Sequence, residues 1–163
     1  MKNDDAPKLV VALATFHQLQ ENKQALNGRF RAAIELVRGE HPFEIIMEEW
    51  RPQSESSFAA TLQGPALKWE NVGTPAEPRF KTWSRGLNCY PPDFDPSSPR
   101  MPEYGPLEVQ ERREAYMTDR ISEAMKPYRV GMFIVGLGHL HSMLVKLRIA
   151  GFSVKGYSWT GEI

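Results

Sequence analysis

Short apolar runs alternate along this chain with stretches of helical periodicity. The runs at 8–16, 43–50 and 129–136 predict strands, and those at 8–16 and 129–136 are nearly continuous in apolarity, which is typical of strands buried on both faces. Between the first two runs, apolar residues recur at three- and four-residue steps over 21–38, and this spacing predicts a helix. Strand, helix and strand in this order form a βαβ unit with parallel strands and a right-handed crossover.

The rest of the chain extends the same scheme. A glycine- and proline-free stretch predicts a helix that Pro127 ends, and a shorter helix precedes Gly151. We therefore expect one α/β domain over 1–163, with a largely parallel central sheet flanked by helices. The further predicted elements are helices at 107–126 and 140–150, a short helix within 51–65, a short strand at 67–72 and an edge strand at 152–159.

Residues 75–106 interrupt this pattern. They hold eight of the thirteen prolines and are too long for an ordinary connection. The segment is either disordered or a long lid within the domain. Its five aromatic residues favour the lid, because disordered segments are usually poor in aromatics.

Bulk properties narrow the function classes. The formal net charge is zero, which argues against general binding to nucleic acid or to an anionic membrane. Cys89 is the only cysteine, so an intramolecular disulfide is excluded, which suits a reducing compartment. No signal peptide is recognisable, and no apolar run approaches the roughly 20 residues that span a bilayer. We expect a cytoplasmic protein without a membrane anchor.

Polar side chains follow three of the predicted strands. His17 follows the first, Glu48 and Glu49 end the second, and His139 and His141 follow the run at 129–136. Ligands of open α/β sheets bind beyond the carboxyl ends of the strands, so these groups are expected around one pocket. In the plainer reading His17 stabilises a loop, the glutamates are solvated, and His141 lies on the surface.

Adjacent strand residues point to opposite faces, so only one glutamate can share a side with His17. We expect Glu48 in that place, with Glu49 supporting a ligand or forming a salt bridge. Two imidazoles and a carboxylate suffice for Zn²⁺, Mn²⁺ or Fe²⁺, and without metal they suit acid–base catalysis. The candidate metal ligands are His17, Glu48, His139 and His141, and the candidate catalytic residues are Glu48, Glu49, His139 and Arg113.

Arg113 lies on the inward stripe of the helix predicted at 107–126. It could clamp an anion or an oxyanion, or it could pair with Glu49 or Glu114 as part of the scaffold. The glycine-rich turn at 136–141 lacks the dinucleotide and Walker patterns, so no nucleotide site is predicted. His41 precedes its strand, at the opposite end of the sheet, and no catalytic role is expected for it.

Four short motifs follow one another in a familiar order. They are 16–20 (FHQLQ), 46–49 (IMEE), 113–117 (REAYM) and 136–139 (GLGH), and 51–106 is not covered. In this order the chain resembles the superfamily that groups erythromycin esterase, the ChaN-like proteins and the TraB/TIKI proteins. The resemblance implies a mixed α/β core with a glutamate–histidine site. Some members use that site for metal-dependent hydrolysis, and ChaN-like members bind haem.

Two functions fit these residues and the resemblance. The first is a metal-dependent hydrolase of a small-molecule or peptide substrate, with residues 75–106 covering the site. The alternative is a non-enzymatic module that binds a small ligand, haem or a protein partner, as an accessory or immunity protein does. A structural reading, in which the polar groups satisfy one another, also stays open. The edge at 152–159 could pair across a homodimer.

Overall fold

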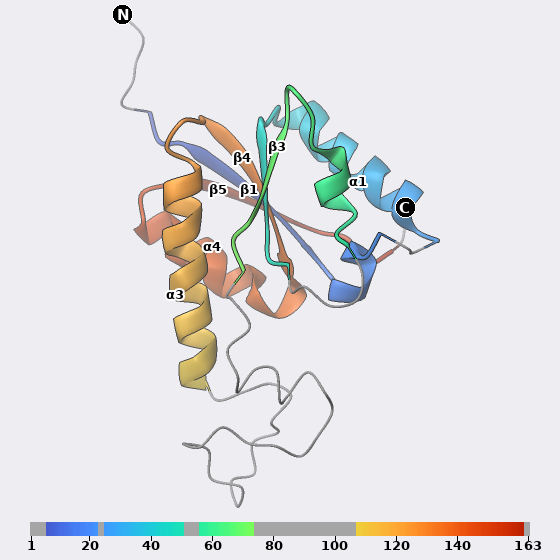
Figure 1. The fold of residues 1–163 in the computed structure, drawn as a ribbon. Coiled ribbons are helices and arrows are strands. Elements are labelled where there is room, and N and C mark those ends of the chain that lie inside the picture. Colours follow the sequence, from blue (N-terminus) through green and yellow to red (C-terminus); the bar gives the residue numbers. More distant parts are fainter. Residues whose placement is uncertain (1–5, 23–24, 51–55, 74–106, 162–163) are drawn as a thin grey trace, which may run out of the picture.

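The computed structural model describes residues 6–22, 25–50, 56–73 and 107–161. Within them, five parallel strands form one sheet in the order β3-β2-β4-β1-β5 (Figure 1). The predicted α/β class is therefore confirmed. The strands are β1 (Leu9–Thr15), β2 (Ile45–Glu48), β3 (Lys68–Asn71), β4 (Val130–Gly136) and β5 (Ser153–Ser158). The helices are α1 (Asn27–Glu40), α3 (Leu107–Ala124) and α4 (Leu140–Ile149), with 3₁₀ turns η1 (His17–Gln20), η2 (Ala59–Leu62) and η4 (Leu137–His139).

Helices cover both faces of the sheet (Figure 1). α1 packs on one face with Phe30, Ile34 and other apolar residues, and α3 and α4 pack on the opposite face. β1 serves both layers, because Val11 faces the α1 side while Val10 faces α3 and α4. Burial on both faces explains why the sequences of β1 and β4 are continuously apolar rather than alternating.

The strand register brings three chain segments to the same end of the sheet. Thr15, the last residue of β1, lies opposite Gly136, the last residue of β4. On the other side of β4, Glu48 lies opposite Ile134, and the backbone N–H of Glu49 donates to the Ile134 carbonyl at 2.8 Å. The residues that follow β1, β2 and β4 therefore meet at one rim.

Most predicted elements are present with slightly different ends, but the helix predicted at 21–38 begins only at Asn27. Glu21 and Asn22, at the start of the predicted helix, take part in tertiary pairing instead. Glu21 forms an antiparallel bridge with Ser57, and the side-chain Nδ2 of Asn27 donates to the Glu21 backbone carbonyl at 2.9 Å. These contacts replace the helical hydrogen bonds that the residues would otherwise make.

The short helix expected within 51–65 is η2, and β5 is an edge strand as expected. Its pairing across a homodimer stays a prediction. The proposed lid at 75–106 lies outside the described residues. Among the helices that are described, none has the length and apolarity to cross a membrane.

Candidate functional site

A cleft of about 390 Å³ opens at the carboxyl ends of β1 and β4. Its wall combines the turn after β1, two residues of α3, and the glycine-rich turn after β4. It is therefore built from segments that lie far apart in the chain. The lining residues are Thr15, Phe16, His17, Gln18, Gln110, Arg113, Gly136, Leu137, Gly138 and His139.

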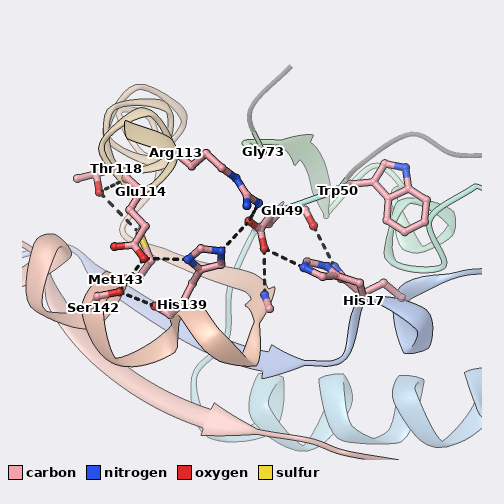
Figure 2. A network of polar contacts seen from close by, with 12 residues as sticks. His17, Glu49, Trp50, Gly73, Arg113, Glu114, Thr118, His139, Ser142 and Met143 are labelled. Atoms are coloured by element: carbon pink, nitrogen blue, oxygen red, sulfur yellow. Dashed lines mark hydrogen bonds and ion pairs between the residues drawn. The ribbon is translucent and has the colours of Figure 1, made fainter. Parts of the chain in front are cut away.

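Glu49 lies among the basic groups of this cleft, and only 1% of its side chain is exposed (Figure 2). One carboxylate oxygen, Oε1, accepts the backbone N–H of Gly136 at 3.1 Å and lies 3.4 Å from Nε2 of His17. The other, Oε2, accepts from Nη2 of Arg113 at 2.9 Å and lies 3.7 Å from Nε2 of His139. Two imidazoles and a guanidinium therefore surround one buried carboxylate.

Glu48 faces the opposite side of the sheet. Its neighbours in β2 show why, since Ile46 packs in the α1 layer and Met47 in the α3–α4 layer. Strand alternation puts Glu48 with Ile46 and directs Glu49 towards α3 and α4. We expected Glu48 in the site and Glu49 in support; the structure places Glu49 between the imidazoles.

Glu48 is fully buried and accepts three hydrogen bonds. Its donors are Nε2 of Gln20 at 2.9 Å, Oγ of Ser57 at 2.5 Å and Nε1 of Trp69 at 2.7 Å. Burial raises the pKa of the Glu48 carboxyl, and the three hydrogen bonds offset only part of that effect. The group is therefore held firmly in place although it does not touch the cleft.

The second ring nitrogen of each cleft histidine has its own partner. Nδ1 of His17 lies 2.7 Å from Oε1 of Gln20, and Nδ1 of His139 lies 2.8 Å from Oε1 of Glu114. Both rings thus present Nε2 towards Glu49, from opposite sides (Figure 2). Histidines anchored at Nδ1 in this way serve as bases, acids or metal ligands through the other nitrogen.

Glu114 joins α3 to α4 beneath His139. Besides the imidazole, Oγ of Ser142 and Nζ of Lys146 donate to it at 2.8 and 2.9 Å. Burial would raise the pKa of Glu114, but the hydrogen bonds from His139, Lys146 and Ser142 together lower it. Glu114 in turn raises the pKa of Lys146, with a further contribution from Glu111. An ionised carboxylate consequently fixes the His139 ring.

The sequence interpretation named Glu114 only as a candidate partner of Arg113, and it missed Gln20 and Lys146. One available signal was that Ser142 and Lys146 stand one turn apart on the same helix face. For Gln20, no local pattern indicates that its side chain is buried.

The other predicted residues are placed as follows. Arg113 forms an ion pair with Glu49, one of the alternatives considered for it. His141 is exposed near the start of α4. His41 follows α1, where its Nε2 lies 3.1 Å from Oη of Tyr157, and it does not line the cleft.

The expected metal ligands do not form a set. Across the described residues, no three or more His, Cys, Asp and Glu side chains are arranged to hold a metal ion. At Glu49, the Arg113 guanidinium 2.9 Å from Oε2 already supplies the positive charge that a cation would bring. The residues as arranged therefore do not fit a metal ion, and uptake of one stays a prediction for binding experiments.

No protein-family model, curated protein or solved structure matches the chain. Nothing there bears on the superfamily resemblance, so the chemistry of the site rests on its own geometry. That geometry combines a half-exposed imidazole, a buried imidazole, a guanidinium and a buried carboxylate. These groups can transfer protons and stabilise negative charge at the same place.

Proposed function

We propose that this cleft is the active site of a hydrolase that acts on a small molecule or peptide bearing a carbonyl or anionic group. One observation carries the proposal. Imidazoles from two different strand ends approach the same buried carboxylate, beside an arginine, in a cleft. Perturbed or densely paired titratable groups that converge in a cleft are the usual mark of a functional site.

In this mechanism, His17 acts as the general base. Its side chain is 48% exposed, so a water molecule in the cleft can reach the ring. The water oxygen attacks the substrate while its proton passes to Nε2 of His17. The resulting imidazolium lies 3.4 Å from Glu49, whose carboxylate stabilises the positive charge.

Two further groups complete the reaction. Arg113 stabilises the negative charge that develops on the attacked group, since it lines the cleft next to both imidazoles. His139 gives a proton to the leaving group, and Glu114 keeps its ring oriented for that transfer. No step depends on a metal ion.

The test is a hydrolysis assay of the full chain with chromogenic esters, phosphate monoesters and short peptides, in chelator and in added Zn²⁺ or Mn²⁺. We expect turnover in chelator, reduced about 10²- to 10⁴-fold in His17→Asn and in His139→Asn. His41→Asn is the matched control and should retain the rate. Turnover that requires the divalent ion would favour the metal-dependent form that the resemblance implies. Equal rates in wild type and His17→Asn would refute the proposal.

A binding module is the second candidate. It is favoured by one observation. Both oxygens of Glu49 already accept a hydrogen bond, so this carboxylate is stabilised by its neighbours without taking part in a reaction. In that case Arg113 and the imidazoles hold an anionic ligand without turning it over. Calorimetry with the same compounds, and with haem, would then show binding without hydrolysis.

A further inference from the structure

The side chain of Gln20, the last residue of the 3₁₀ turn after β1, is fully buried. Its Nε2 amide group donates to Oε1 of Glu48 at 2.9 Å and to the Glu49 backbone carbonyl at 3.3 Å. Both of these atoms accept hydrogen bonds. A flipped amide would set the Gln20 oxygen against the Glu49 backbone carbonyl oxygen, which only accepts, so the orientation of this amide is fixed whether or not Glu48 carries a proton.

The carboxyl group that contacts Gln20 is itself held by two donors on its other oxygen. Trp69 donates to Oε2 of Glu48 through an indole N–H, which can only donate. Ser57 donates to the same oxygen and in turn accepts the backbone N–H of Ala60 at 3.2 Å. These contacts leave Oε1 of Glu48 directed at Gln20.

The fixed amide presents its oxygen to His17. Oε1 of Gln20 lies 2.7 Å from Nδ1 of the imidazole, and because that oxygen only accepts, Nδ1 must carry the proton. Glu49 competes for the opposite tautomer, since a proton on Nε2 could point at its Oε1. That contact is 3.4 Å long, beyond an ordinary hydrogen bond, so the shorter contact to Gln20 determines which ring nitrogen carries the proton.

We infer that Glu48 and Gln20 are positioning residues that hold neutral His17 in the tautomer protonated at Nδ1, leaving a bare Nε2 at the cleft. The tautomer follows from the hydrogen bonds alone; its use in water activation rests on the proposed function. Glu48 thereby acts on the site through Gln20 rather than by touching a substrate.

The direct test is a long-range ¹H–¹⁵N spectrum of the labelled full chain, with the His17 signals identified by their loss in His17→Asn. For the neutral ring, we expect the ¹⁵N shift of a protonated Nδ1 and of an unprotonated Nε2. In Gln20→Met, which keeps the size but not the acceptor, the proton should move to Nε2. His139 is the internal control, because its Nδ1 partner is Glu114 and its signals should not change.

The wild-type spectrum decides even if Gln20→Met does not fold, because a proton on Nε2 of neutral His17 would overturn the inference. So would an unchanged His17 spectrum in folded Gln20→Met. Where hydrolysis is observed, Gln20→Met should lower kcat about 10- to 100-fold with little change in KM. The predicted tautomer without any hydrolysis would uphold the inference and reject the hydrolase.

Discussion

Gly136 ends β4 where the chain passes closest to His17, and replacing it with alanine should separate the stability of the fold from the integrity of the site. An added Cβ would lie 2.7 Å from Nε2 of His17 and 3.3 Å from Oε1 of Glu49. The first distance is shorter than any ordinary contact, so one of the two groups has to move. The backbone itself accepts alanine, because Gly136 has φ −61° and ψ 143°.

The cost depends on what moves. Overpacking in a closed core costs about 1–3 kcal/mol, but the half-exposed His17 ring can rotate outwards, which keeps the cost near ~1 kcal/mol. Replacing glycine by alanine also restricts the unfolded chain, which stabilises by about 0.4–1 kcal/mol. The two effects nearly cancel. We expect Gly136→Ala to change the free energy of unfolding by less than about 1 kcal/mol while displacing His17 from Glu49.

Urea denaturation measures the first quantity, and the His17 ring signals in long-range ¹H–¹⁵N spectra measure the second. Two other glycines provide matched controls. At Gly138 an added Cβ meets nothing within 4 Å, so alanine should leave the His17 signals unchanged and stabilise the fold by about 0.4–1 kcal/mol. At Gly131 it meets the buried side chains of Met125 and Met47, so alanine should cost about 1–3 kcal/mol without a local effect on His17. Wild-type His17 signals in Gly136→Ala would refute the reasoning.

Two further predictions concern buried charge. The pKa of Glu48 is raised above its ordinary 4.5 by burial, so the folded state retains this proton more strongly than the unfolded chain, and the associated stability is lost as pH rises above about 4.5 through the raised pKa. Denaturation at several pH values should therefore find Glu48→Gln gaining on wild type with increasing pH; a pH-independent difference would contradict this. Arg113→Met should cost about 3–5 kcal/mol by leaving Glu49 buried without its ion pair, whereas Arg120→Met, at the exposed pair with Glu70, should cost at most about 1 kcal/mol. Equal costs in denaturant would show that burial of the Arg113 pair is unimportant.

The strands were predictable because burial on both faces leaves a continuous apolar run, as in β1 and β4. The start of α1 was not predictable, because Glu21 suits a helix by composition but pairs instead with the distant Ser57. Such a contact has no local signature in the sequence.

The site, like the fold, was predictable only in part. The common rim for His17, His139 and a β2 carboxylate followed from parallel strands, and strand alternation limited the choice to one glutamate. Which glutamate faces the imidazoles depends on the side from which α3 and α4 approach, and two adjacent acidic residues do not reveal that side. Glu114 gains His139, and Gln20 gains Glu48, only through tertiary packing.

The order β3-β2-β4-β1-β5 has a consequence for motion. The three strands that lead to Glu49, His139 and His17 are the interior ones, and each is hydrogen-bonded on both sides. Local opening begins at the margins of a sheet, so amide hydrogens in β3 and β5 should exchange with solvent long before those of β1, β2 and β4. Fraying of β5 would leave the geometry around Glu49 intact, whereas opening of β3 would take Trp69 away from Glu48 and so loosen the contact by which Gln20 holds His17.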